Sequence, residues 1–325
     1  MATISTTSSS EAQQESGVVR SFLRKYREQS LIFYLLIVVA VAATIFIPSF
    51  RTGSNARNIF VQSVSLGFVS IGQTFVMISG GFDLSVGSVI SLASCLTSGI
   101  IDGRLEYLVP VMLLVIIIGG SVGLLNGVLI SKLHFAPFIA TFASMSLVQG
   151  VTYLYTKYPP GSMPSAFSYF ANGTIAFIPF PLILLVLVLA AAAYVLARRK
   201  YGRYVYSVGS NLEFSRLSGI NTAKVLIITY VISSLLAVVT AFFLTSRMGI
   251  GDPNIGSDVE INSITAAFLG GTVNGRGSVL CTYAGVLTLG MIANILNMLN
   301  VSSYWQMALR GAILVAVVLR GIKTV

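Results

Sequence analysis

The sequence predicts an all-α integral membrane protein, on three observations. Of its 325 residues, 55% are hydrophobic and only 9% are Asp, Glu, Lys or Arg, whereas a soluble domain carries about 25% charged residues. Apolar runs long enough to cross a bilayer as helices recur along the chain. The net charge of +10 fits cytoplasmic loops, which collect Lys and Arg. These observations argue against a soluble enzyme, a disordered protein and a nucleic-acid-binding domain.

About ten transmembrane helices are expected after a polar tail. Residues 1–30 are predicted to be a cytoplasmic tail, rich in Ser, Thr, Gln and Glu at first and basic just before the apolar sequence begins. Residues 31–325 are predicted to form a single transmembrane domain. The third and eighth spans are short and rich in Gly or Ser, which favours broken or re-entrant segments near the centre. The expected spans lie near 31–48, 58–79, 84–101, 109–131, 137–155, 179–197, 224–246, 261–275, 279–299 and 303–320.

The distribution of basic residues predicts that both termini are cytoplasmic. In this layout, the loop near 156–178 is extracytoplasmic and the basic loop 198–223 is cytoplasmic. Far more Lys and Arg then fall on the cytoplasmic side, as the positive-inside rule requires. The cytoplasmic set is Arg20, Arg24, Lys25, Arg27, Lys132, Arg198, Arg199, Lys200, Arg203, Arg216, Lys224, Arg276, Arg320 and Lys323. The opposite set is Arg51, Arg57, Arg104, Lys157 and Arg247.

The motifs of enzymes and ATP-driven motors are missing from the sequence. No phosphate-binding G-x-x-x-x-G-K-[ST] loop, G-x-S-x-G elbow or H-E-x-x-H pair occurs. Cys95, Cys281 and His134 stand apart from one another, so they have no metal-ligand spacing, and both cysteines are expected to be buried apolar residues. We therefore expect a protein that is not an enzyme and that holds no cofactor of its own.

Asp83 is the most informative acidic residue, because it interrupts apolar sequence inside a Gly- and Ser-rich stretch. A charge at membrane depth costs at least about 2.5–3.5 kcal/mol, so it usually faces protein or a water-filled cavity. In one interpretation, Asp83 and Ser85 shape a central pathway or a gate. In the other, Asp83 caps the helix that starts near Leu84. Arg310 in the last span needs either a partner or a route to the interface.

A sequence echo links two glycine-rich stretches. Residues 80–89 read GGFDLSVGSV and residues 270–279 read GGTVNGRGSV, so both have two glycines, five residues and then GSV. Gly-interrupted segments in the two halves of a transporter point to its pathway. Coincidence in a chain with 30 glycines is the alternative. The layout also puts both copies on the same side, which does not fit a simple inverted repeat.

The basic loop 198–223 contains the pattern of a short capped helix. Ser210 and Glu213 have the spacing of a capping box, and Gly219 stands where a helix stop belongs. A helix of about two turns is not stable alone, so it must pack on its own protein or on a partner. It is either an ordinary connection or a docking element for a cytoplasmic motor.

The acids Asp258 and Glu260 lie just before the eighth span. They are candidates for contact with an extracytoplasmic partner or for a gate. The alternative is a solvated helix start, where acids suit the helix dipole.

Several stretches together resemble the permease subunits of bacterial ABC importers for monosaccharides, the ribose-type permeases. They are GGFDLSVGSV (80–89), NGVLISKL (126–133), APFIATFASMSLVQGV (136–151), YGRYVYSVGSNLEFSRLSGIN (201–221), ITAAFLGGT (264–272) and NVSSYWQ (300–306). They follow in order over most of the chain beyond the tail. The sequence departs from the family's usual pattern at Phe82, Asn262 and Asn274.

The resemblance implies a bacterial inner-membrane permease that moves a pentose or hexose into the cytoplasm by alternating access. It implies three partners: an ABC ATPase that binds ATP and Mg²⁺, a second permease copy or paralogue, and a periplasmic solute-binding protein. The path candidates are Asp83, Ser85, Asn126 and Thr141. The residues of 201–221 that match the family's ATPase-contacting loop are Gly202, Arg203, Asn211, Arg216, Leu217 and Gly219.

Two other functions stay open at this point. An ion-coupled secondary transporter would need ionisable residues near the midplane, where Asp83 and Arg310 are nearly the only candidates. An importer of the same family that carries a different small solute would share every motif above. A membrane enzyme acting on lipid lacks any recognisable nucleophile or metal set.

Overall fold

The computed structural model describes residues 31–322, and most of them are helical. The predicted tail 1–30 lies outside the described residues, as do residues 323–325. An apolar helix, Leu31–Phe46, comes first. The long helices that follow are α2 (Gly53–Ile78), α3 (Val86–Ile101), α4 (Leu108–Ser131), α5 (Pro137–Tyr155), α7 (Phe180–Arg198), α10 (Thr222–Met248), α11 (Val259–Leu269), α12 (Val279–Met298) and α13 (Ser303–Ile322).

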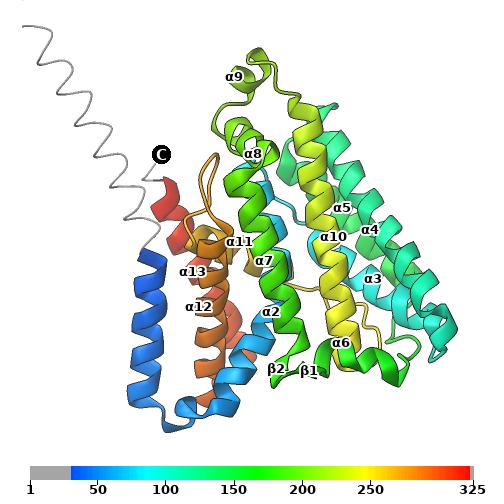
Figure 1. The fold of residues 1–325 in the computed structure, drawn as a ribbon, viewed down its shortest axis with the longest axis vertical. Helices are drawn as coiled ribbons and strands as arrows, with labels where there is room; N and C mark the ends of the chain where they lie inside the picture. The colour runs from blue at the N-terminus through cyan, green and yellow to red at the C-terminus, as the bar shows by residue number, and fades with distance from the viewer. Residues whose placement is uncertain (1–30, 323–325) are drawn as a thin grey trace, which may run out of the picture.

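Short elements mark the two ends of the molecule (Figure 1). One end carries α8 (Lys200–Ser210) and α9 (Leu212–Leu217), and we call it the α8–α9 end. The other, the loop end, carries 3-10 turns, one short helix and a two-stranded antiparallel hairpin. These are η1 (Pro48–Arg51), η2 (Leu105–Tyr107), η3 (Ser165–Ser168), α6 (Tyr169–Asn172), β1 (Thr174–Ile175) and β2 (Ile178–Pro179).

Ten apolar helical segments lie close to the ten predicted spans, but they are not ten equal crossings. Six helical segments are long and apolar enough to cross a bilayer, namely α2, α4 with its preceding turn, α5, α7, α10 and α12. Leu31–Phe46, α3 and α11 are shorter. The predicted eighth span, 261–275, is wrong in extent, because α11 ends at Leu269 on the Gly270–Gly271 pair and a tight turn follows.

Helix α10 lies at the centre of the bundle and packs closely on α4. Gly119, Gly123 and Gly127 recur every four residues along α4, so they form one smooth stripe. A methyl group on Gly123 would lie 2.6 Å from the Tyr230 carbonyl oxygen, and one on Gly127 would lie 2.6 Å from the Ile227 Cα. The small residues therefore let the two backbones approach until they touch. The rest of the bundle is built around this pair.

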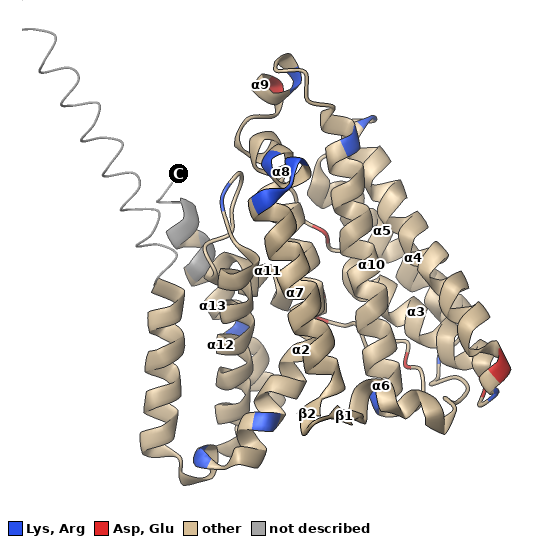
Figure 2. Cartoon of the chain, viewed as in Figure 1, with Lys and Arg blue, Asp and Glu red and all other residues tan. Residues whose placement is uncertain are grey.

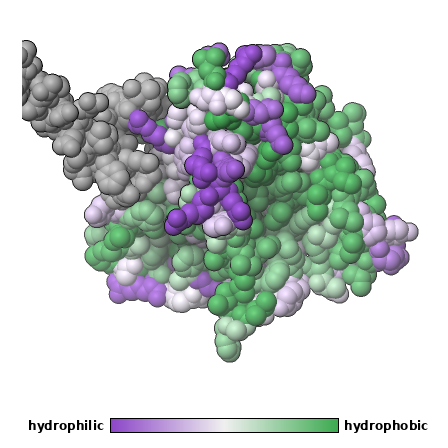
Figure 3. Space-filling view, turned by 45° about the horizontal axis from the view of Figure 1, so that its top comes forward, coloured by the Kyte–Doolittle hydropathy of each residue, from purple (hydrophilic) through white to green (hydrophobic). Residues whose placement is uncertain are grey.

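The core continues on both sides of α10. Phe68, Phe75 and Phe243 join α2 and α10 in one buried cluster, and Val89, Ile90 and Phe242 join α3 and α10 in a second. Cys95 and Cys281 are buried apolar residues, as predicted. Figure 3 shows hydrophilic side chains gathered near the α8–α9 end and a broad hydrophobic surface below them. This surface matches a bilayer.

Candidate functional site

The first break in the bundle is the irregular stretch 79–85 between α2 and α3. Helix α2 ends on Gly80, whose φ of +94° only glycine adopts without cost. The backbone beyond it is buried, so its polar groups must find partners inside the protein. The Phe82 carbonyl accepts hydrogen bonds from the Tyr230 hydroxyl and the Thr141 hydroxyl, both at 3.3 Å. The Gln73 amide is placed to bond both backbone groups of Asp83, at 3.2 and 3.3 Å.

Asp83 is fully buried and bonded on both carboxylate oxygens. Oδ1 accepts from the Ser85 backbone N–H at 3.0 Å and from the Ser85 hydroxyl at 2.6 Å, while Oδ2 accepts from the Ser233 hydroxyl at 2.7 Å. Helix α3 begins after Ser85, and no side chain caps its first turn directly. Asp83 therefore fixes the turn that enters the helix and ties it to α10, which is a variant of the predicted cap.

The four predicted path residues do come together around this break. Asn126 Nδ2 donates to Ser85 Oγ at 2.9 Å, and Ser144 Oγ donates to Asn126 Oδ1 at 2.5 Å. Thr141 contacts the same break through Phe82. All four, however, are 0% exposed, so they do not line an open space in this conformation. Their part in transport stays a prediction, and their visible part is to hold the broken span in place.

The second break is the stretch 249–258, which precedes α11. It runs along α3, whose serines recur on one face and bond its backbone. Ser98 Oγ accepts from the Gly251 N–H at 2.7 Å, and Ser91 Oγ accepts from the Gly256 N–H at 3.2 Å. This serine stripe explains how irregular backbone is tolerated in an apolar setting. It also explains why the third predicted span is so rich in Ser.

The two short helices α3 and α11, which we call the half-helices, meet at their first turns. Glu260 at the start of α11 packs on Gly87 at the start of α3, and Gly87 also touches the backbone of Gly256. Gly87 lies fourteen residues before the end of α3, about 21 Å from the loop end at 1.5 Å per residue. Glu260 is thus partly buried within the bundle, whereas Asp258 is exposed. Contact with an extracytoplasmic partner and a gate both stay predictions for these acids.

Both glycine pairs of the sequence echo hold a helix stop, but not at equivalent positions of the repeat. Gly80 and Gly271 both have positive φ, +94° and +73°. After each, the next N–H bonds a carbonyl five residues back, Gly81 to Val76 at 3.0 Å and Thr272 to Ala267 at 2.9 Å. Each pair therefore contains a Schellman helix stop, but the glycine with positive φ is the first of one pair and the second of the other. Because Gly275 N–H bonds the Ile78 carbonyl at 2.8 Å, the two copies also lie side by side.

Helices α8 and α9 replace the predicted loop 198–223. Helix α8 was not predicted. Buried Gly202 lets it turn closely against α7, because a methyl there would lie 2.6 Å from the Leu196 Cα. The cap of α9 was predicted at the wrong residue. Asn211, not Ser210, accepts from the Phe214 N–H at 2.8 Å, while Ser210 ends α8.

The predicted stop of α9 is confirmed. Gly219 has a φ of +81°, and the N–H of Ile220 bonds the Ser215 carbonyl at 3.1 Å.

Helix α9 presents its apolar residues to the outside. Its buried residue is the polar Ser215, which bonds Ser207 Oγ at 2.8 Å. Leu212, Phe214 and Leu217 are 49%, 66% and 79% exposed, and we call these three the α9 apolar patch. Arg203 and Arg216 are also exposed beside it, and Figure 2 shows the basic residues gathered at this end. A surface helix that folds with its polar side inward is suited to binding another protein.

The end of α8 packs directly against the end of α2 and against the turn that follows α11, which we call the two glycine turns. A methyl on Gly209 would lie 2.8 Å from the Ile78 carbonyl carbon and 2.7 Å from the Gly275 nitrogen. A methyl on Gly275 would lie 2.8 Å from the Ser210 Cα. Tyr206 adds a hydrogen bond from its hydroxyl to the Gly277 carbonyl at 2.8 Å. Burial raises the pKa of Tyr206, so this phenol stays protonated and keeps donating.

Comparisons with known proteins identify the family. The family model described as "Branched-chain amino acid transport system / permease component" matches residues 55–318. The ribose import permease protein of Escherichia coli K12 is 35% identical over 299 residues, 90% of this chain and 92% of its own. The L-arabinose permease of the same strain is 32% identical over 87% of each chain, and the D-allose permease is 29% identical over 88% and 89%.

No solved structure matches this chain significantly. The sequence relatives are permease subunits, which confirms the resemblance to ribose-type permeases, and the matched region includes both breaks and α8–α9. The chain therefore belongs to this family of transport-system permeases, together with the ribose, arabinose and allose permeases.

Proposed function

We propose that this protein is the translocation subunit of an ATP-driven importer that brings a monosaccharide into the bacterial cytoplasm. The relatives that support a sugar as cargo are named for ribose, arabinose and allose. A separate ABC ATPase would bind ATP and Mg²⁺, and a solute-binding protein would deliver the sugar at the loop end. A second permease would complete the path, which opens alternately to the two sides.

The orientation follows from charge. The α8–α9 end carries Lys132, Arg198, Arg199, Lys200, Arg203, Arg216, Lys224 and Arg276. By the positive-inside rule this end faces the cytoplasm. Figure 1 shows that the first helix starts, and α13 ends, toward this same end. Both termini of the domain are then cytoplasmic, and the protein lies in the inner membrane as a multi-pass permease.

The observation that carries the proposal is the α9 apolar patch. It stands on a helix that is capped at both ends and whose apolar side chains point away from its own protein. Fully burying a Leu or Phe side chain is worth about 1.5–3 kcal/mol. We assign the patch, with Arg203 and Arg216, as the surface on which the ATPase docks.

The packing at Gly209 supplies a route for coupling. If ATP binding moves α9, α8 moves with it, because Ser207 and Ser215 join the two helices. The end of α8 has no free space against Ile78 and Gly275. Its displacement would therefore be passed to the end of α2 and to the turn after α11. Each turn adjoins one of the two half-helices, so one input would move both sides of the candidate gate at Gly87 and Glu260.

The test replaces one exposed phenylalanine at each end of the molecule. Phe214→Glu puts a charge into the α9 apolar patch, whereas Phe177→Glu changes a residue that is 99% exposed at the β1–β2 turn. We expect Phe214→Glu to weaken co-purification of the ATPase by about tenfold or more, since 1.4 kcal/mol is tenfold in affinity. Phe177→Glu should leave it unchanged. Equal ATPase binding by both variants would refute the docking role.

Ion-coupled secondary transport is a second candidate, favoured by one specific observation. Glu260 Oε2 is buried and has no hydrogen-bond partner among the described residues, and such a carboxylate could take up a cation or a proton. Sugar uptake in vesicles separates the two functions. Uptake that stops when the ATPase is deleted supports the importer. Uptake that continues on a sodium or proton gradient supports the second candidate.

A further inference from the structure

The membrane-facing sides of this protein are of two kinds. Helices α4, α5 and α7 expose large apolar side chains, such as Ile117 at 68%, Phe138 at 59% and Leu187 at 62%. These sides suit lipid. The side formed by α2, α11, α12 and α13 also exposes apolar side chains, such as Met307 at 61% and Val315 at 59%, but amides and an arginine are spaced among them. A permease needs one such side, since a polar solute cannot be passed along a surface that suits lipid.

Two exposed amides of α2 lie on the same face of the helix as Leu66. Asn58 and Gln62 are exposed and Leu66 is half-buried, and their spacing of four residues places them one above another. From Asn58 to Leu66 the line rises about 12 Å. It runs from the loop end toward the middle of the bundle. Since Leu66 lines a pocket, the line of amides leads into that pocket.

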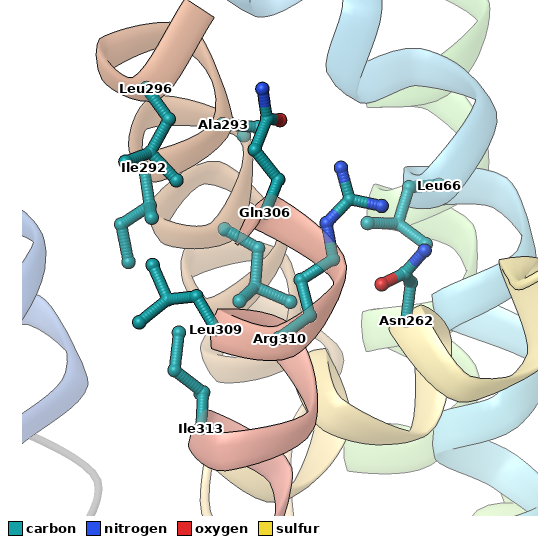
Figure 4. A pocket seen from close by; sticks show the side chains of 11 residues that line it. Leu66, Asn262, Ile292, Ala293, Leu296, Gln306, Leu309, Arg310 and Ile313 are labelled. Atoms are coloured by element: carbon teal, nitrogen blue, oxygen red, sulfur yellow. The ribbon is translucent and has the colours of Figure 1, made fainter. Parts of the chain in front are cut away.

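The pocket is open and lies between α2, α11, α12 and α13. Figure 4 shows Arg310 of α13 extending toward Leu66 and toward the amide of Asn262 on α11. Gln306 lies one turn before Arg310 and is fixed by bonds from Nε2 to Asn297 Oδ1 and the Val301 carbonyl, at 2.8 and 3.0 Å. Its carbonyl oxygen is left as an acceptor.

Arg310 has neither an ion pair nor a hydrogen bond with any residue in the described range 31–322. An arginine at membrane depth is costly and normally faces a partner or a water-filled space. It does not pair with Asp83, whose oxygens are engaged elsewhere. Its guanidinium N–H groups thus face the pocket without an acceptor among the described residues.

The groups at the pocket define the ligand chemistry. A guanidinium offers several donors in a planar fork, and amides offer both donors and acceptors. Sugar hydroxyls both donate and accept, so neighbouring hydroxyls can bond the fork and the amides together. The single positive charge and the apolar remainder, Leu289, Ile292, Ala293 and Leu296, make the site weak. A weak site lets the solute leave again, as transport requires.

We propose that the α2–α11–α13 side is the wall of the solute path, and that Arg310, Asn262 and Gln306 form a stopping site for the hydroxyls of a neutral sugar. This inference rests on the proposed import of a monosaccharide. In this inference the path does not run through the buried Asp83 cluster, which holds the first break in place. The contact surface of the path would be completed by the second permease.

Cysteine accessibility in the complete importer tests the wall. Because Cys95 and Cys281 are buried, the unmodified protein should react slowly with a charged, membrane-impermeant thiosulfonate. Asn262→Cys and Gln62→Cys are compared with Ile117→Cys, which is exposed on the lipid side of α4. We expect the first two to react at least tenfold faster than the third, and 10 mM D-ribose, L-arabinose or D-allose to slow Asn262→Cys at least threefold.

The outcomes separate this inference from the proposed function. If Asn262→Cys reacts no faster than Ile117→Cys while the complex still takes up sugar, the path lies elsewhere and only this inference fails. Reaction that none of the three sugars slows would overturn the stopping site. Loss of ATP-dependent uptake in the unmodified complex would instead remove the proposed function. Arg310→Gln should raise the KM for uptake about tenfold, and Arg310→Lys should raise it less; equal KM values in all three proteins would also count against the site.

Discussion

Gly209 is the position where the smallest possible change should uncouple the transporter. Its Cα faces the backbone of Ile78 and of Gly275, and these two residues are themselves joined by the 2.8 Å hydrogen bond from Gly275 N–H to the Ile78 carbonyl. A methyl group at Gly209 would meet backbone atoms rather than a flexible side chain. No rotamer change can therefore make room for it.

The size of the effect follows from these distances. The methyl carbon would lie 2.8 Å from the Ile78 carbonyl carbon, whereas carbon atoms pack best at about 3.5–4.0 Å. The Ile78 carbonyl oxygen would be closer still, so the end of α8 must move by more than about 0.7 Å to restore contact. Overpacking of this kind costs about 1–3 kcal/mol. The shift would also strain the Gly275–Ile78 hydrogen bond, which connects the two glycine turns.

The assay compares Gly209→Ala with Gly53→Ala and Gly150→Ala, two helical glycines with open space around the Cβ position. Sugar uptake, ATP hydrolysis and ATPase co-purification are measured for each complex in proteoliposomes. We expect Gly209→Ala to retain the ATPase but to take up several times less sugar per ATP hydrolysed, while the two controls behave like the unmodified protein. An unchanged ratio of uptake to hydrolysis in Gly209→Ala would refute the coupling route through α8.

Three further predictions use the same complex. Gly219→Val should weaken docking of the ATPase, because a β-branched residue at a φ of +81° costs about 1–2 kcal/mol; Gly219→Asn should be tolerated, and co-purification distinguishes them. Asp83→Asn should lower uptake more than it lowers the amount of folded protein, since only one carbonyl oxygen remains for the bonds from Ser85 and Ser233; equal losses of both would mark a purely structural residue. Tyr206→Phe should lower the melting temperature by the loss of one hydrogen bond, about 1 kcal/mol, and identical melting curves would contradict a role for the bond to Gly277.

The local pattern of the chain was enough to predict several elements. The long apolar runs were recovered as helices near their expected positions, because hydrophobic length is a local property. The helix stop at Gly219 was predicted for the same reason, since glycine adopts a positive φ without a steric cost, whereas the stops at Gly80 and Gly271 were not predicted. The repeated GG–GSV pattern is not one geometry used twice, because the helix stop lies on the first glycine of one pair and on the second glycine of the other.

Other features needed the tertiary structure. The capping box at Ser210 matched a pattern, but the helix begins one residue later, because Ser210 is the last residue of α8 and Asn211 already caps α9. Helix α8 has no long apolar run, but Tyr201, Val205 and Val208 recur at helical spacing and pack into the core, a local signal that the prediction of a loop missed. Its contacts with Ile78 and Gly275 join segments far apart in the chain.

The candidate site shows the same division. The sequence by itself determined that Asp83 and Arg310 need special surroundings, since a charge in apolar sequence is costly unless it has a partner or contact with water. Only the tertiary structure decided their different surroundings: Asp83 is enclosed by Ser85 and Ser233, and Arg310 faces an open pocket beside Asn262. The physical reason is that the energy of a charge depends on the groups within a few ångströms of it, and those groups come from helices that the sequence does not place side by side.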